Sequence, residues 1–532
     1  MNDLAPTPRQ LGELARLALI NAADLAADAQ VLQDAGRYPR AFALATLATE
    51  EVGKHYLCVS WSGFDPTDNH SCLDKGGPGG TGGYRSRGSR CEARRVFKST
   101  ALTVLRTFRQ QLHASLGLRQ DSLFELLDSA LSSPDRRTLV RLSLNPAFRR
   151  RWPSTCDALS DGRLDPNGLR RLFVQTLPPA PDRPLWVIDG SHWPRPRAAT
   201  SPARTCEWHP VAGQPQHHLV PAWAYQWLVA VPEPDGSWVL PLDVPRRDAA
   251  AGTPTAVAIQ QIRSTCALQS AEAPRPVVAL DSGYEAGQLA QAKLEADCLV
   301  RLAVHRVFFG TPGPYSGRGR PRLHGARLCL RDPQTHGTPD RSATTPHPVY
   351  GQVAVDAWTN LHTRTAPHTT LTVIRVCVER LPGKRRPPHP LWLAWIGGPL
   401  PDDLHQVWRW YLRRCVVEHA FRFVKQTLGW TTVRPRSPQA ADRWTWLIAA
   451  GLWQLWLARW LTVDAHLPWE RRTSQPPTPG QVQRGFAGLL LRAGTPAREP
   501  LSRGKSPGRS PGQTPGPAPR FSFVRRAPPR AA

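Results

Sequence analysis

Apolar residues recur at helical spacing in two parts of the first 180 residues. Residues 10–60 hold two such runs separated by a turn at Gly36, and they predict a helical hairpin. Residues 61–95 are rich in glycine and polar side chains, so we predict a linker or junction there. Helical spacing returns over residues 96–180, which we expect to form a helical region.

From residue 181 the pattern changes to short, strongly apolar runs of the kind that form buried strands. Over residues 181–305 three strands, a helix, a strand, a helix and another strand follow in close order. This order predicts an α/β fold, in which a mixed sheet is flanked by helices. Further strands among Pro- and Arg-rich loops predict a β-rich insertion over residues 306–398.

The last part of the chain divides into a helical segment and a tail. Residues 399–495 contain two long apolar helical patterns, which we expect to complete the α/β core. Residues 496–532 are rich in Arg, Pro and Gly and cannot form a core. We therefore predict a disordered basic tail after residue 495.

The charge of the chain indicates the kind of partner that it binds. Lys and Arg number 68 against 41 Asp and Glu in 532 residues, a formal net charge of +27. A polyanion such as DNA is the expected partner, and a basic composition without a partner is the alternative. The ten cysteines are widely spaced without a C-x-x-C pair, which argues against a zinc finger and a secreted disulfide scaffold.

Two predicted strands run directly into an aspartate. One strand leads into Asp189 and the other into Asp281. Acidic residues at the ends of neighbouring strands converge where the backbone opens into a cleft, so the two can share a cation. The alternative is ordinary turn chemistry, because Asp-Gly and Asp-Ser-Gly are common turns.

A long predicted helix after the insertion carries charged residues on one face. At about 100° per residue the face that contains Leu404, Val407 and Cys415 also presents Tyr411, Arg414, Glu418 and Lys425. The apolar members predict that this face packs on the protein. Charged groups on a packed face need partners or a chemical role.

These four polar residues form the pattern Tyr411-x2-Arg414-x3-Glu418-x6-Lys425, which resembles the Y-R-E-K signature of bacterial insertion-sequence DDE transposases. The resemblance covers residues from about 100 to the end. It implies an RNase H-like catalytic domain with a β-rich insertion before the glutamate helix. It also implies that Asp189, Asp281 and Glu418 are the catalytic metal ligands, and that Tyr411, Arg414 and Lys425 contact DNA phosphates.

The implied chemistry accounts for the residue types. Phosphodiester cleavage must activate a water molecule and stabilise a leaving alkoxide, and two Mg2+ or Mn2+ ions serve both ends of the displacement. Hard divalent ions prefer carboxylate oxygen. The expected partners are double-stranded DNA, as element ends and target, and a second copy of the chain on DNA. With no signal peptide or membrane span in the sequence, we expect a cytoplasmic, nucleoid-associated bacterial protein.

Other chemistry-bearing residues give weaker signals. His192 and Glu285 adjoin the two aspartates but more simply are turn or surface groups, and adjacent His217 and His218 point to opposite faces of a strand. Two larger sets are candidates for DNA contact. The candidates for an aromatic support of a flipped base are Trp358, Trp392 and Trp395. The candidates for a phosphate-tracking loop are Arg318, Arg320 and Arg322.

The first 60 residues carry a second resemblance. The segment with Asn21, Asp28, Glu50, Glu51 and Lys54 is similar to the start of V-type abortive-infection proteins of phage defence. The match stops near the Gly-rich stretch, which indicates a fragment of that family. Two alternatives to a transposase remain open: a metal-dependent nuclease without strand transfer, and a non-catalytic phage-defence or DNA-binding fusion.

Overall fold

A computed structural model describes most of the chain after residue 84. It covers residues 85–524 except 135–136, 181–182, 211–216, 316, 318, 384–387, 463–466, 468–469, 471–475, 502–511, 513 and 515, together with residues 27, 30 and 31. The predicted helical hairpin at 10–60 and most of the predicted linker at 61–95 lie outside these residues.

Five strands form the centre of the molecule. β1 (Leu185–Pro194) pairs antiparallel with β3 (His217–Val231) and parallel with β6 (Val277–Leu280). β4 (Leu240–Asp243) is antiparallel to β3, and β7 (Asp297–Arg301) is parallel to β6. The order β4-β3-β1-β6-β7 is that of an RNase H-like fold, so the predicted mixed sheet flanked by helices is confirmed.

The β-rich segment continues the same sheet. β13 (Leu391–Ile396) pairs antiparallel with β7 and extends the sheet into the segment predicted as an insertion. Beyond β13 the order is β12, β11, β8 and β9, with β10 paired to β11. These strands are β8 (Val307–Phe309), β9 (Arg327–Cys329), β10 (Arg341–His347), β11 (Gly351–Thr363) and β12 (Ala366–Val378). Two more strands, β2 (Thr205–Pro210) and β5 (Arg246–Arg247), pair with β3.

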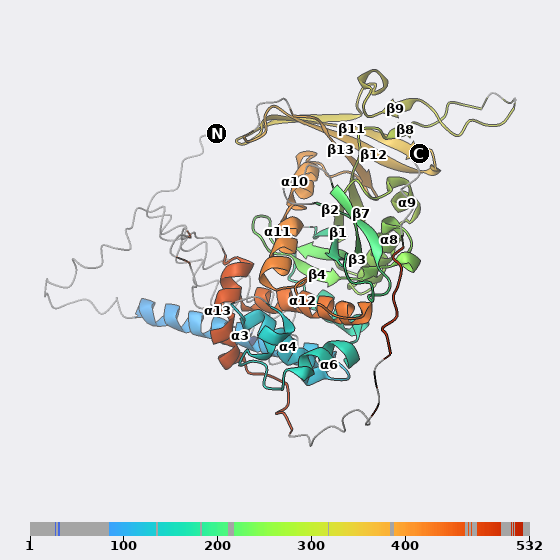
Figure 1. Cartoon of the computed structure of the whole chain (residues 1–532). Helices are drawn as coiled ribbons and strands as arrows, with labels where there is room; N and C mark the ends of the chain where they lie inside the picture. The colour runs from blue at the N-terminus through green and yellow to red at the C-terminus, as the bar shows by residue number, and fades with distance from the viewer. Residues whose placement is uncertain are drawn as a thin grey trace, which may run out of the picture.

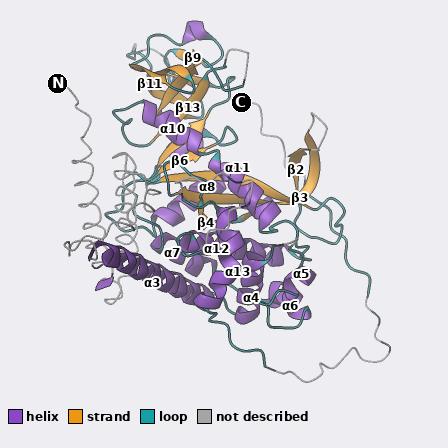
Figure 2. Ribbon diagram, turned by 90° about the vertical axis from the view of Figure 1, so that its left-hand side faces the viewer, coloured by secondary structure: helices purple, strands orange, loops and turns teal. Residues whose placement is uncertain are grey.

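Helices cover the core sheet and form a bundle at one end of the molecule (Figures 1 and 2). α8 contacts β3, α11 contacts β1, and α12 contacts β4 as well as the bundle. The helices near the sheet are α8 (Pro254–Cys266), α9 (Ala286–Gln291), α10 (His405–Arg413), α11 (Val416–Arg422), α12 (Pro438–Ala458) and the short η2 (Ala249–Ala251) and η3 (Pro333–Thr335). The bundle contains α3 (Arg85–Ala114), α4 (Gln120–Ser132), α5 (Leu139–Ser143), α6 (Pro153–Asp161), α7 (Pro166–Gln175) and α13 (Pro479–Ala493).

α12 is the central helix of the core. Its tryptophans Trp444, Trp453 and Trp456 are almost fully buried. Buried indole N–H groups need an acceptor, and Trp453 Nε1 donates to Pro241 O beside β4 at 2.7 Å. This helix therefore joins the bundle to the sheet. No helix in the described ranges has both the length and the apolar content that crossing a bilayer requires.

The predicted linker is wrong at its C-terminal end, because α3 begins at Arg85 and not after residue 95. Residues 85–95 have few apolar positions, yet arginine, alanine and glutamate are good helix formers, and the segment continues into the amphipathic part of the helix. One contact reaches back toward the N-terminal region: Thr100 Oγ1 donates to Gln30 Oε1 at 3.4 Å.

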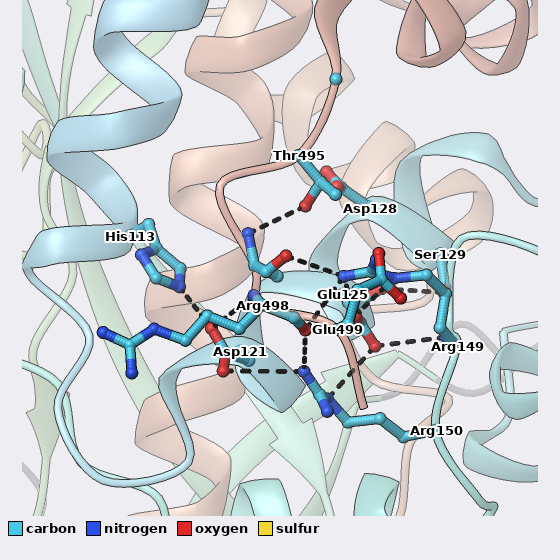
Figure 3. Close-up of polar contacts among 12 residues, drawn as sticks. His113, Asp121, Glu125, Asp128, Ser129, Arg149, Arg150, Thr495, Arg498 and Glu499 are labelled. Atoms are coloured by element: carbon cyan, nitrogen blue, oxygen red, sulfur yellow. Dashed lines mark hydrogen bonds and ion pairs between the residues drawn. The ribbon is translucent and has the colours of Figure 1, made fainter. Parts of the chain in front are cut away.

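The predicted disordered tail is also wrong where the structure describes it. Residues 497–499 lie along α4, where Arg149 Nη2 donates to Ala497 O at 2.8 Å and Arg498 N donates to Asp121 Oδ1 at 3.2 Å (Figure 3). Val524 pairs with Thr205 of β2. Low hydrophobicity predicted disorder, but backbone groups and ion pairs hold these segments without an apolar core of their own.

Candidate active site

β1 and β6 bring the two predicted aspartates side by side. Ile188 lies opposite Leu280 in the parallel register, so Asp189 and Asp281 are the next residues on neighbouring strands. Paired strands lie about 4.8 Å apart. Asp281 follows the end of β6, as predicted, but Asp189 does not end its strand, because β1 continues to Pro194 on hydrogen bonds to β3.

Both aspartates accept a hydrogen bond from the N–H of the next residue. Asp189 Oδ1 accepts from Gly190 N at 2.7 Å, and Asp281 Oδ1 accepts from Ser282 N at 2.6 Å. Each carboxylate has one further oxygen for another partner. The turn interpretation therefore applies at Asp281 alone, because Asp189 lies within β1.

The long helix predicted before and after Glu418 is interrupted. α10 ends at Arg413, α11 begins at Val416, and the π-helix η4 (Phe423–Thr427) follows. Between α10 and α11 the backbone bonds tighten to i→i−3 spacing, for example from Glu418 N to Cys415 O at 3.1 Å. The i→i−3 bonds tighten the helix before Glu418, and the π-helix η4 widens it afterwards. The rotation per residue therefore departs from the 100° of a regular α-helix.

This break corrects the predicted packed face. Leu404, Val407, Tyr411 and Arg414 are buried as expected. Cys415 is exposed, and 61% of the Glu418 side chain is exposed. The glutamate thus projects from the rim of the site and is not enclosed by it.

Arg414 links the acids. Its Nη1 lies 2.7 Å from Asp189 Oδ2, and its Nη2 lies 3.4 Å from Glu418 Oε1. Burial would lower the pKa of Arg414, but nearby Tyr411, Asp189 and Asp281 outweigh burial and raise it. One guanidinium is therefore the counter-charge of a three-carboxylate group.

The pKa of Asp189 records how close the acids are. Burial raises this pKa above its ordinary value, and the charges of Asp281 and Glu418 raise it further. Arg414 and the Gly190 N–H act in the opposite direction without cancelling the rise. The three predicted acids thus share one electrostatic environment.

Two tyrosines line this environment. Tyr411 is buried, and its pKa is raised by burial and by the charge of Asp281. Tyr284 is also buried, and its pKa is raised by burial together with Asp189 and Asp281. The sequence analysis did not single out Tyr284, although its position three residues after Asp281 was the available signal.

Lys425 lies apart from the group. It belongs to the π-helix, where its Nζ lies 5.9 Å from the centre of the Trp430 ring. Burial lowers its pKa, and no carboxylate contributes to the shift. Of the four residues in the Y-R-E-K pattern, the structure gathers Tyr411, Arg414 and Glu418 and leaves Lys425 outside.

The acids have the donor chemistry of a divalent-cation site. Within the described ranges, no three His, Cys, Asp or Glu side chains are arranged ready to hold a metal ion. Arg414 stands between Asp189 and Glu418 as a cation. Carboxylate oxygens at this position fit Mg2+ or Mn2+, provided that the ion replaces the contact between Arg414 and Asp189.

The weaker candidates have structural surroundings. Glu285 is paired with Arg306 at 2.7 Å, and His218 is exposed. Arg320 and Arg322 are exposed, and Arg318 lies outside the described residues. The three tryptophans Trp358, Trp392 and Trp395 are at most 5% exposed, so they are core residues and not an open support for a flipped base.

Comparison with known families covers two of the three acids. A family model described as "DDE superfamily endonuclease" matches residues 111–365. The matched range contains Asp189 and Asp281, and the helix with Glu418 follows it in the same fold.

Two further comparisons complete the description. A family model described as "AbiV" (HEPN_AbiV) matches residues 10–75, so the abortive-infection resemblance is confirmed and runs into the predicted linker. Among solved structures, the chain is similar to a piggyBac transposase synaptic complex with hairpin DNA, at 10% identity and a TM-score of 0.35. That similarity covers 63% of this chain and 65% of the other. No curated protein matches the chain.

Proposed function

We propose that this chain is a DNA transposase that cuts DNA at the ends of an insertion sequence and joins the freed 3′ ends to target DNA. The observation that carries the proposal is the group formed by Asp189, Asp281 and Glu418, with Arg414 as its counter-charge, at the edge of a DDE endonuclease sheet.

In this proposal Asp189, Asp281 and Glu418 hold two Mg2+ or Mn2+ ions. The ions supply Lewis-acid stabilisation of the attacking and leaving oxygens. Asp189 and Asp281 are fixed by strand register and by their bonds to Gly190 and Ser282, so they set the position of the site. Glu418 is exposed on α11 and is able to adjust its side chain to the ions and the DNA.

Arg414 and Tyr411 act on the DNA side of the proposed site. The Arg414 guanidinium, which bonds Asp189 in the structure, would contact a phosphate beside the cut once a divalent cation held Asp189 in its place. Tyr411 remains next to Arg414 and orients it. We assign Lys425 to a phosphate further along the strand, because it lies outside the carboxylate group. Such contacts position the DNA without reading its sequence.

Strand transfer separates the transposase from its nearest alternative. Purified full-length protein would be incubated with a precut DNA end, a supercoiled plasmid and Mg2+, with Asp281→Asn as the inactive control. We expect joined products with the wild-type protein alone. Metal-dependent cutting without joined products would favour the nuclease, and DNA binding without cutting would favour the non-catalytic fusion that the AbiV match suggests.

The proposed partners are double-stranded DNA and a second copy of the chain, since two ends of an element must be joined together. Sedimentation of the protein with and without DNA ends tests this assembly. A monomer on both ends would contradict it.

A further inference from the structure

A cluster of arginines lies beyond the C-terminal end of β1, apart from the carboxylate group. We define this arginine surface by its described members, which come from the β1–β2 loop, the segment before α12 and the C-terminal segment: Arg195, Arg197, Arg204, Arg434, Arg436 and Arg520. Arg197, Arg434, Arg436 and Arg520 are exposed, Arg195 is half-buried and Arg204 is 4% exposed. Three segments far apart in sequence therefore supply one basic region.

The contacts among these segments hold the region together. Arg195 Nη2 donates to Pro435 O at 2.8 Å, which joins the β1–β2 loop to the residues between Arg434 and Arg436. Arg204 Nη1 donates to Arg195 O at 3.2 Å, and Arg204 Nη2 donates to Phe521 O at 2.8 Å. The buried Arg204 guanidinium thus links the loop to the C-terminal segment.

The C-terminal segment is fixed by its backbone. Phe521 N donates to Ala199 O at 2.9 Å, Val524 N donates to Arg204 O at 2.9 Å, and Cys206 N donates to Val524 O at 3.1 Å. Val524 thereby adds a bridge to the free edge of β2. Backbone bonds of this kind are the usual means by which an extended segment joins a sheet edge.

The arginine surface has no acidic partner. Within the described part of the chain, no ion pair joins any of its six arginines to a carboxylate. Burial lowers the pKa of Arg195, and the nearby charges of Arg434 and Arg204 lower it further. Cations gathered without a counter-charge repel one another, so a bound polyanion would stabilise the cluster.

We propose that this arginine surface binds the phosphate backbone of DNA at a distance from the cut, and that residues 521–524 hold it in shape. Asp189 and Pro194 are five strand residues apart, or about 17 Å. This length corresponds to about five base pairs along a duplex. The proposal rests on the proposed function, because it assumes that the carboxylate group marks the place of the cut.

A charge-matched pair of variants tests the surface. Arg197→Gln/Arg434→Gln removes two exposed arginines of the surface, and Arg163→Gln/Arg171→Gln removes two exposed arginines of the bundle. Binding of a short linear DNA duplex would be measured between about 50 and 200 mM salt. We expect the slope of log K against log salt to fall by up to about 1.8 for the first variant, at about 0.9 per lost contact, and to stay unchanged for the second.

A second pair tests the C-terminal segment without changing any charge. Val524→Pro removes the N–H that bonds Arg204 O, whereas Ser522→Pro lies in the same segment at an N–H with no partner among the described residues. We expect weaker DNA binding for Val524→Pro than for Ser522→Pro, with equal melting temperatures.

The outcomes separate this inference from the proposed function. Equal salt slopes for the two arginine variants would overturn the arginine surface, even if cleavage still depends on Asp189. Cleavage that survives Asp189→Asn would overturn the catalytic assignment. The comparison of the salt slopes would still test the arginine surface. A wild-type protein that does not bind the duplex at low salt would overturn both.

Discussion

The helical bundle and the sheet edge both gather acidic side chains, but they neutralise them differently. In the bundle the acids around α4 lie against several cations, as Figure 3 shows. Asp128 pairs with Arg109 at 2.7 Å, and Glu125 pairs with Arg149 at 2.8 Å and with Arg150 at 3.3 Å. Each of these carboxylates is paired with at least one arginine, although burial still raises the pKa of Glu125.

At the sheet edge three acids have one arginine. Arg414 contacts Asp189 and Glu418, and burial, together with the charges of Asp281 and Glu418, still raises the pKa of Asp189. The contrast teaches that burial of carboxylates does not by itself mark a functional site. An excess of acids over local cations does, because the remaining charge calls for a ligand.

The largest effect that follows from this contrast is on cleavage. Asp189→Asn, Asp281→Asn and Glu418→Gln should each reduce metal-dependent DNA cleavage far beyond the roughly 10- to 100-fold that loss of an outer-shell partner costs. DNA binding should persist. The matched control is Asp243→Asn, a buried aspartate at the end of β4 that is paired with Arg170. Equal losses of cleavage per folded protein in the control would contradict the contrast.

A second experiment removes the cation of a buried acid in the bundle. Arg109→Met leaves Asp128 buried without its cation and should lower the free energy of unfolding by about 3–5 kcal/mol. The remaining folded protein should cleave DNA at the wild-type rate. Denaturant unfolding and cleavage per folded molecule measure the two quantities separately. A stable protein that has lost cleavage would place the bundle pair in the active site.

A smaller effect is expected on metal binding, because Arg414 and a divalent ion compete for Asp189. Arg414→Gln removes the cation that a divalent ion has to replace, so Mn2+ should bind the DNA-free protein about tenfold more tightly. Cleavage should nevertheless fall, because the phosphate contact is lost. Arg413→Gln is the control, since its guanidinium donates to backbone oxygens of Glu233 and Gly236. Unchanged Mn2+ affinity for Arg414→Gln would show that the arginine does not compete.

A change of a few degrees in melting temperature is expected at Asp121. Burial alone would raise its pKa, but bonds from His113 and Arg498 and the charge of Arg150 outweigh burial and lower it. A lowered folded pKa stabilises the protein above the unfolded value, and this stability is lost as the pH falls through the folded pKa. Asp121→Asn should therefore melt earlier at neutral pH and converge with wild type below pH 3.8. A pH-independent difference would contradict the assignment.

The smallest effect should come from the N-terminal region. A chain beginning at Arg85 keeps the whole of α3 and loses the contact from Thr100 to Gln30. We expect it to melt and to cleave DNA like the full chain, because both assignments of function lie beyond residue 85. A folded truncated protein that no longer transfers strands would assign a working role to the AbiV-like region.

The sequence alone determined the order of the core elements. Alternating and continuous apolar runs identified the strands at β1, β3, β4, β6 and β7 and the helix α8 between them, because burial of one face or both faces leaves a period that is readable locally. The Y-R-E-K pattern and the two aspartates after apolar runs were likewise identified from the local sequence. Strand pairing then placed Asp189 beside Asp281.

The tertiary structure decided what the sequence of a short segment does not contain. The break after α10 and the π-helix η4 altered the rotation of the helix, so Glu418 became exposed and Lys425 left the group. The composition of the C-terminal segment predicted that it would not pack, yet the backbone of Val524 pairs with Thr205 at the edge of β2. Hydrophobic spacing reports which side chains are buried within one element. The partners of charged groups and free backbone bonds depend on which elements meet, which only the folded chain settles.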